Sequence, residues 1–225
     1  MRSHSLAAHV GPFFVFLALL GLVPLASDPA GPFWRAHPEF WVFPLQTIVC
    51  GALLLWWRDS YQFRPLGAGA IAIGILAGAI AFAVWISPQW VFGAGARLDG
   101  FNPALVAESP AGHSATLALR LLRLVVIVPF LEEVFWRAFV LRYLVREDFE
   151  SVPMGAFTWL SFGAVSLAFM FEHTRPDWPA ALVTGALFNY VAYSTRSLGA
   201  CVLAHAITNL LLGLYVLRTG QWGFW

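Results

Sequence analysis

The sequence predicts an all-α fold, a polytopic membrane helix bundle of about seven transmembrane helices, with six to eight compatible with the pattern. Of its 225 residues, 60% are hydrophobic and only 11% are charged. A soluble domain carries about a quarter charged residues, so this chain lacks the side chains that a water-exposed surface needs. Apolar runs long enough to cross a bilayer, about 20 residues each, recur along its length.

The apolar runs predict the spans in chain order. They cover residues 11–26, 40–57, 66–86, 124–144, 154–173, 179–194 and 198–217. The first run could pass for a signal peptide, but Val23–Ser27 is a poor cleavage site and six more runs follow, so we expect a membrane helix. Tryptophans near the run ends are expected to act as interfacial anchors, and these are Trp41, Trp56, Trp57, Trp85, Trp90, Trp159, Trp178, Trp222 and Trp225.

We expect a single integral membrane domain over residues 1–225, in which residues 1–115 form N-terminal helices and a long loop and residues 116–217 form the core helices. The net charge is +1 and all thirteen basic residues are arginine, so no basic block is available for nucleic acid. Cys50 and Cys201 fall in apolar runs and are expected to be packed hydrophobic residues. Arg120 and Arg123 share a helix face and suggest an interfacial lead-in to the fourth span.

Two adjacent acids, Glu132 and Glu133, lie with Arg137 inside the apolar run 125–141. Ionised side chains are costly at membrane depth and are usually paired or functional. Glu133 and Arg137 are four residues apart, with the acid first, which predicts an intrahelical ion pair that supports the packing. Glu132 points about 100° away. It has no basic partner on its own helix, so it must face another helix.

The polar residues that Glu132 could meet lie on two other spans. His173 ends the fifth span, and His205 and Asn209 share one face of the last span. Glu132 lies about 12 Å below the helix end near Leu124, and the next span returns to that side, so these residues can share a cavity that opens to one side. Taken singly, the histidines and Asn209 also fit an interfacial or interhelical hydrogen-bonding role, and Glu132 could be a second partner of Arg137 or a pore-lining acid.

The three motifs, Glu-Glu-x-x-x-Arg (132–137), Phe-x-x-x-His (169–173) and His-x-x-x-Asn (205–209), resemble in their order the CPBP (ABI) family of intramembrane proteases. That family includes CAAX prenyl endopeptidases of the Ras-converting-enzyme type and prokaryotic relatives. The resemblance covers about the last hundred residues. It implies an integral protein, expected in a prokaryotic cytoplasmic membrane, that hydrolyses a peptide bond of a membrane protein or lipidated peptide.

The resemblance also implies roles for single residues. Glu132 falls on the catalytic glutamate, and Glu133 and Arg137 on the second acid and the arginine. His173 matches the histidine that helps to bind and activate water, while His205 and Asn209 match the pair that stabilises the oxyanion. Ordinary chemistry agrees, because a buried glutamate can take a proton from water and two nitrogen donors can stabilise the charge that develops on attack.

Two alternatives stay open at the level of sequence. Glu132, His173 and His205 also supply the ligand types of a catalytic zinc site, although no His-Glu-x-x-His helix is present and Asn209 is a poor zinc ligand. The favoured interpretation requires no cofactor. The second alternative is a non-enzymatic transporter, immunity protein or scaffold; a transporter more often shows internal repeats, and none stands out here.

Overall fold

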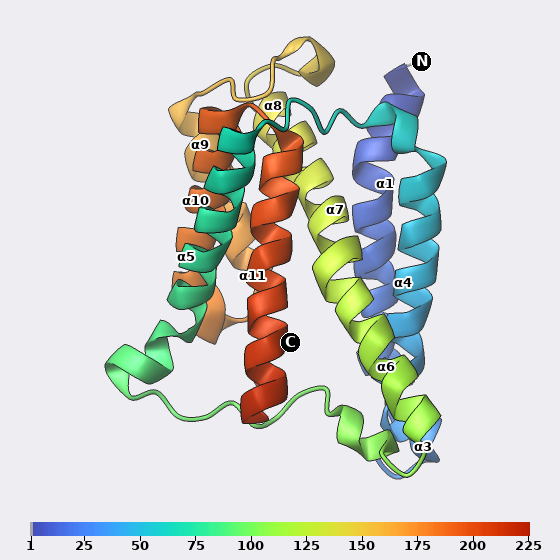
Figure 1. Ribbon diagram of the computed structural model, residues 1–225. Helices are drawn as coiled ribbons and strands as arrows, with labels where there is room; N and C mark the ends of the chain where they lie inside the picture. Colours follow the sequence, from blue (N-terminus) through green and yellow to red (C-terminus); the bar gives the residue numbers. More distant parts are fainter. Residues whose placement is uncertain (1) are drawn as a thin grey trace.

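The computed structural model describes residues 2–225, with side chains from His4 onward, and this part of the chain is helical with no strand (Figure 1). The all-α prediction is therefore confirmed. The longer helical segments are α1 (Arg2–Leu20), α2 (Leu22–Ala26), α3 (Phe33–Ala36), α4 (Glu39–Trp56), α5 (Ala68–Phe92), α6 (Pro110–Leu122), α7 (Val128–Glu133), α8 (Leu141–Tyr143), α9 (Trp159–Phe171), α10 (Trp178–Thr195) and α11 (Leu198–Thr219). Segments η3 (Arg123–Ile127) and η4 (Val134–Val140) are π-helical. Short 3₁₀ turns are η1 (Arg58–Ser60), η2 (Pro103–Val106), η5 (Phe149–Ser151), η6 (Arg175–Asp177) and η7 (Trp222–Phe224).

Each predicted span coincides with a helical segment. Five segments of the described chain are long and apolar enough to cross a membrane, namely residues 4–26, 39–56, 68–92, 110–143 and 198–219. The remaining two predicted spans correspond to α9, a shorter apolar helix, and to α10, which has 18 residues. Both pack in the same bundle, since α9 lies against α10 and α10 against α5. The helix bundle is therefore confirmed, with five helices of spanning length and two further helices at the seven predicted positions.

The fourth span is one continuous helical segment, which we call the motif helix, and it runs from Pro110 to Tyr143. It begins earlier than the predicted Leu124 because Ser109 caps it: the Ser109 hydroxyl accepts from the backbone N–H of Gly112, and Pro110 occupies the first turn. The π-helical segments η3 and η4 flank α7, which carries both acids. Such π-helical insertions within α-helices are frequent at functional sites.

Arg120 and Arg123 correct a second expectation about this helix. They were expected at the membrane interface, but they are only 4% and 5% exposed. Their guanidinium groups lie over aromatic rings, both of them over Phe43 on α4. The spacing of Arg120 and Arg123 correctly predicted that they share one face of the helix. Helix α4 packs against that face and covers both side chains.

The motif helix stands between α1 and α4 on one side and α11 on the other (Figure 1). On its far side α11 packs closely against α5, because Gly74 and Gly78 leave room for its backbone. A Cβ atom on Gly78 would lie 2.5 Å from the carbonyl oxygen of Ala204. The hydroxyl of Thr208 donates to the carbonyl of Gly78 at 3.1 Å. Small residues that allow close approach are typical of membrane helix contacts, and this contact fixes the helix that carries His205 and Asn209.

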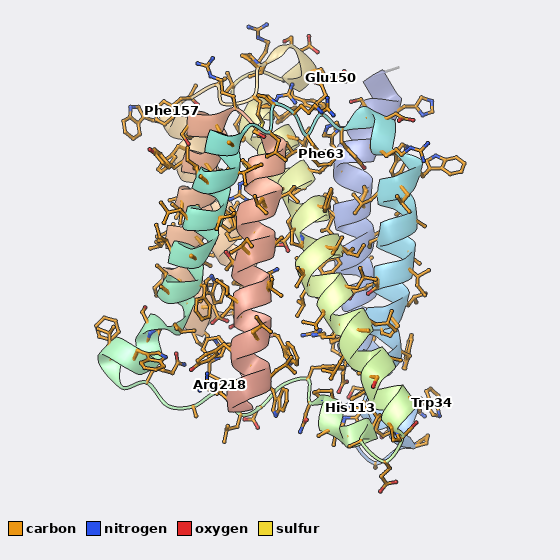
Figure 2. The ribbon with its side chains drawn as sticks, viewed as in Figure 1. Trp34, Phe63, His113, Glu150, Phe157 and Arg218 are labelled. Carbon is orange, nitrogen blue, oxygen red and sulfur yellow. The ribbon has the colours of Figure 1, made fainter. Side chains whose placement is uncertain are left out.

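The outer surface of the bundle is apolar, as a lipid-facing surface requires. Large hydrophobic side chains are exposed along the helices, Ile48, Leu76 and Leu167 among them. Charged and aromatic side chains gather at the two ends, with Glu150, Phe63 and Phe157 at one end and Trp34, His113 and Arg218 at the other (Figure 2). Both cysteines are buried and unbridged, which confirms their prediction as packed residues.

Candidate active site

The acid pair begins the site, and its two members have different surroundings. Glu133 and Arg137 are completely buried, and Nη1 of Arg137 donates to Oε1 of Glu133 at 3.0 Å. Nη2 of Arg137 donates to the carbonyl of Gly185 at 3.2 Å and ties the motif helix to α10. Glu132 receives no hydrogen bond from any described residue, although it is only 7% exposed. The expected ion pair is present, and it leaves Glu132 outside it.

His205 on α11 lies between the two acids. Its Nδ1 is 2.9 Å from Oε1 of Glu133, and its Nε2 is 4.0 Å from Oε2 of Glu132. Oε1 of Glu133 therefore contacts a nitrogen of Arg137 and a nitrogen of His205. The predicted ion pair with Arg137 is only one of the two contacts of Glu133, because spacing along one helix cannot reveal a partner on another.

Asn209 is held by a backbone carbonyl of the motif helix. Its Nδ2 donates to the carbonyl oxygen of Leu124 at 2.8 Å. Leu124 lies in η3, where a backbone N–H bonds to the carbonyl five residues earlier. Five residues after Leu124 stands Pro129, which has no N–H to donate. The side-chain amide of Asn209 therefore donates to the carbonyl oxygen of Leu124 in place of a backbone N–H. The second N–H of this amide stays available to another acceptor.

His173 follows the end of α9 and is fixed on three sides. Its Nδ1 is 2.9 Å from the carbonyl oxygen of Phe169, which accepts a hydrogen bond and so places the proton on Nδ1. The ring lies 5.0 Å from the Phe169 ring and 5.3 Å from the Trp85 ring. The backbone carbonyl of His173 accepts from Nε1 of Trp178 at 3.0 Å. This arrangement leaves Nε2 of the neutral imidazole with a lone pair.

Glu132, His173, His205 and Asn209 line one cavity of 390 Å³. They come from three segments that are far apart in the sequence, the motif helix, the end of α9 and α11. Glu133 and Arg137 do not line this cavity and lie behind it. The cavity therefore joins the four residues that the sequence grouped together and separates them from the ion pair.

Sequence reasoning missed several residues of the cavity. Glu172, which follows α9, lines the cavity, and its Oε2 accepts from Nε1 of Trp136 at 3.0 Å. Burial raises the pKa of this carboxyl, which lies in the turn beyond α9, to about 7. Trp85 was expected to be an interfacial anchor, yet it lines the cavity and its Nε1 donates to Thr184. Only their positions near run ends were visible in the sequence, and a run end does not distinguish a lipid-facing side chain from one that turns inward.

The zinc alternative concerns the same side chains. In the described part of the chain, no group of three or more histidine, cysteine, aspartate or glutamate side chains is arranged to hold a metal ion. Nδ1 of His205 is directed at Glu133 and Nδ1 of His173 at the carbonyl of Phe169. Those contacts leave Nε2 on each ring, and Nε2 of His205 lies 4.0 Å from Oε2 of Glu132.

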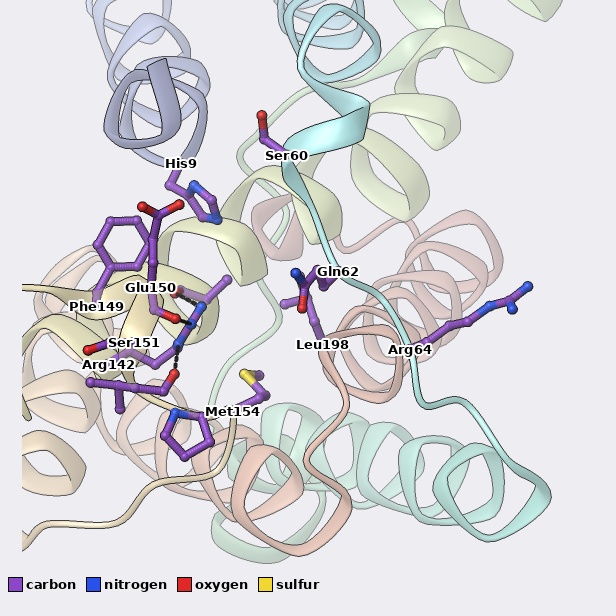
Figure 3. Close-up of a pocket in the computed structure, with 13 residues that line it drawn as sticks. His9, Ser60, Gln62, Arg64, Arg142, Phe149, Glu150, Ser151, Met154 and Leu198 are labelled. Atoms are coloured by element: carbon purple, nitrogen blue, oxygen red, sulfur yellow. Dashed lines mark hydrogen bonds between the residues drawn. The ribbon is translucent and has the colours of Figure 1, made fainter. Parts of the chain in front are cut away.

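A second cavity, of 270 Å³, is formed by different residues (Figure 3). His9, Arg142 and Glu150 line it, together with the loop before α9. Arg142 is already satisfied, because it donates to the backbone carbonyls of Val152, Ala138 and Glu150. None of the motif acids, histidines or Asn209 contributes to this cavity. The candidate chemistry therefore belongs to the first cavity.

The comparison with protein families agrees with this constellation. Residues 114–211 match the family model described as type II CAAX prenyl endopeptidase Rce1-like. The matched range contains all three motifs. These residues are similar to the Rce1-like family of CAAX endopeptidases, and the helices of spanning length fit an integral membrane protein. Neither curated proteins nor solved structures gave a match.

Proposed function

We propose that this protein is an intramembrane endopeptidase in which Glu132 activates a water molecule that hydrolyses a peptide bond. The observation that carries the proposal is the cavity in which Glu132, without a hydrogen-bonding donor, lies with His173, His205 and Asn209. The similarity of residues 114–211 to CAAX endopeptidases supports the reaction class. The substrate in this proposal is a membrane protein or lipidated peptide, and the resemblance to prokaryotic relatives favours a cytoplasmic membrane as the location.

The first step is the activation of water. His173 has its proton on Nδ1, so its Nε2 can accept from a water molecule while the carboxylate of Glu132 accepts the water's second proton. The oxygen then attacks the peptide carbonyl carbon, and Glu132 retains the proton. In the second step Glu132 delivers that proton to the departing amine. A positioned acid or base of this kind contributes about 10²–10⁴-fold to a rate.

The oxyanion that forms on attack needs donors. Asn209 has one N–H held by Leu124, which orients the amide and leaves the other N–H to donate. His205 directs Nδ1 at the Glu133 carboxylate, so it donates through Nε2 only when both ring nitrogens carry protons. The Glu133 carboxylate fixes the orientation of that ring through this contact. In this proposal Glu133 supports catalysis through His205, in addition to its ion pair with Arg137.

The proposal is tested with Glu132→Gln, which preserves the shape of the side chain and removes the base. Membrane proteomes of a deletion strain are compared with those of strains that carry the unsubstituted protein or the variant, and an unprocessed membrane polypeptide is sought. We expect Glu132→Gln to fail to process it, with unchanged expression and thermal stability. Glu150→Gln, the same change at the second cavity, is the matched control and should process normally. Normal processing by Glu132→Gln would exclude the mechanism.

A further inference from the structure

Two arginines of the motif helix are buried without a carboxylate partner. Arg120 and Arg123 are 4% and 5% exposed, and in the described residues neither forms an ion pair with an acid. The other buried arginine of this helix, Arg137, is paired with Glu133. A buried charge without a counter-ion is strongly unfavourable unless something binds it. Glu132, in the same cavity, acts electrostatically on Arg123 but forms no ion pair with it. The two arginines are therefore a candidate site for an anion that comes from outside the chain.

Arg123 presents its guanidinium to the cavity that holds Glu132. Its Nε donates to Oε1 of Gln46 at 3.0 Å, and Nε2 of Gln46 donates to the carbonyl of Phe16 at 2.7 Å. This chain of hydrogen bonds fixes the plane of the guanidinium. The two terminal nitrogens of Arg123 have no acceptor among the described residues, and the side chain lines the cavity. They form a rigid fork of donors that is aimed at the space beside the candidate site.

Arg120 adds a second positive charge behind this fork. Its guanidinium carbon lies 4.6 Å from the Phe43 ring and 4.9 Å from the Phe101 ring. The guanidinium carbon of Arg123 lies 4.5 Å from the same Phe43 ring. Nε and Nη1 of Arg120 are buried and have no hydrogen-bond partner. Aromatic rings exclude water without neutralising the charge, so the positive field around Arg123 is weakly screened.

The position along the helix relates this fork to the reacting bond. Arg123 precedes Glu132 by nine residues, which corresponds to about 13 Å at 1.5 Å per residue. An extended peptide covers about 3.3–3.6 Å per residue. A peptide that passes Glu132 and lies along the motif helix would thus reach Arg123 about four residues from the bond that is cut.

We propose that Arg123, with Arg120 behind it, binds a carboxylate of the peptide substrate within about four residues of the scissile bond. The inference rests on the proposed protease function. A planar guanidinium recognises a carboxylate through two parallel hydrogen bonds. The carboxylate is either the terminal α-carboxylate of the peptide or an aspartate or glutamate side chain. Arg97, which also lines the cavity, is not available for this role, because it forms a two-pronged ion pair with Asp177.

Binding tests the inference without requiring turnover. The full chain carrying Glu132→Gln is purified in detergent, and its affinity is measured for three fluorescent hydrophobic peptides of one parent sequence. The first ends in a free carboxylate, the second is amidated, and the third is amidated with one residue near its end replaced by aspartate. We expect at least one carboxylate peptide to bind about 10-fold or more tightly than the neutral peptide. Which of the two does so identifies the source of the carboxylate.

Substitutions on the same background assign the preference to Arg123. Arg123→Gln should reduce it to about 2-fold or less, and Arg123→Lys should retain part of it, because lysine keeps the charge and loses the fork. Arg97→Gln makes the same charge change in the same cavity and should leave the preference intact. The melting temperature of Arg123→Gln should not fall below that of its parent, because the substitution removes a charge that is buried and unpaired in the free protein.

Three results would overturn the inference: equal affinity for all three peptides, no binding of either carboxylate peptide, or an undiminished preference in Arg123→Gln. These outcomes are separate from the test of the protease function. A preference for carboxylate peptides, in a protein that shows no Glu132-dependent processing, would contradict the proposed protease function and still support the carboxylate site at Arg123. Glu132-dependent processing without such a preference would contradict only the role of Arg123.

Discussion

Nδ1 of His205 lies 2.9 Å from Oε1 of Glu133, the oxygen that also accepts from Nη1 of Arg137. One fully buried carboxylate oxygen thus links the last helix to the motif helix and balances two nitrogen donors. Because Glu133 is occupied in this way, Glu132 is the acid left to face the cavity. In the proposed mechanism the adjacent acids have two separate tasks: Glu133 orients His205, and Glu132 acts on water.

Glu133→Gln separates the charge of Glu133 from its shape. The variant leaves Arg137 buried without a counter-ion, and we expect a loss of about 3–5 kcal/mol in the free energy of unfolding. The double variant Glu133→Gln/Arg137→Met removes both charges and should recover most of that stability. It should not recover activity, because His205 still lacks its anion. The measurements are unfolding in detergent and processing of the substrate.

The double variant distinguishes a catalytic contribution of Glu133 from a structural one. If restored stability brings restored processing, Glu133 acts only through packing and its link to His205 has no catalytic consequence. Arg142→Met is a control for removal of an arginine from the same helix, since the half-buried Arg142 donates only to backbone carbonyls at the other cavity. It should change stability without a specific loss of processing.

Asn209→Ala removes one proposed oxyanion donor and should lower kcat about 10²–10³-fold with little change in KM. Pro129→Ala probes the same donor indirectly. The new N–H at position 129 can bond to the carbonyl of Leu124 and compete with Asn209, whose amide then loses its anchor. We expect a smaller decrease in kcat than for Asn209→Ala. Full activity in Asn209→Ala would remove Asn209 from the mechanism.

Hydropathy and spacing predicted the features that depend on one helix at a time. Apolar runs gave the seven spans, and the four-residue spacing gave the pair of Glu133 with Arg137. The three motifs grouped residues that line one cavity. The catalytic roles assigned to those residues stay predictions, because they describe a reaction and not an arrangement.

Features that depend on contacts between helices were not predictable from these patterns. The second partner of Glu133 is on α11, and the partner of Asn209 is a backbone carbonyl whose availability follows from π-helical bonding and from Pro129. Arg120 and Arg123 looked interfacial because periodicity identifies a common face and says nothing of what covers it. Glu172 and Trp85 lie at run ends, where the sequence pattern is the same for inward and outward side chains.

Treatment with chelators should leave processing unchanged. The proposed reaction uses Glu132 and His173 on water, and the described side chains do not converge into a metal-binding group. The purified protein is incubated with 1,10-phenanthroline or EDTA, and activity and zinc content are measured before and after. A loss of activity that added zinc restores would establish the metallopeptidase alternative with Glu132, His173 and His205 as the ligands to be tested.

Glu172→Gln should flatten the dependence of stability on pH. The pKa of Glu172 is raised from 4.5 to about 7, chiefly by burial, while the hydrogen bond from Trp136 and the charge of Arg137 oppose the shift and Glu133 adds to it. Between these two values the folded protein binds more protons than the unfolded chain, so this group makes stability fall as pH rises. Glutamine does not titrate. The melting temperature of the variant should therefore decrease less between pH 5 and pH 8 than that of the unsubstituted protein.

The same variant should affect catalysis through Glu132. Glu172 and Glu132 line the same cavity, so the charge of one acts on the other. Replacement of Glu172 should therefore alter the acid limb of the pH profile for kcat/KM. Glu150→Gln removes a carboxylate at the other cavity and should leave the limb in place. Because the activity of Glu172→Gln should persist while that of Glu132→Gln is lost, the pair also tests which of the two cavity carboxylates is the base. Loss of processing in Glu172→Gln alone, with Glu132→Gln active, would reverse the assignment.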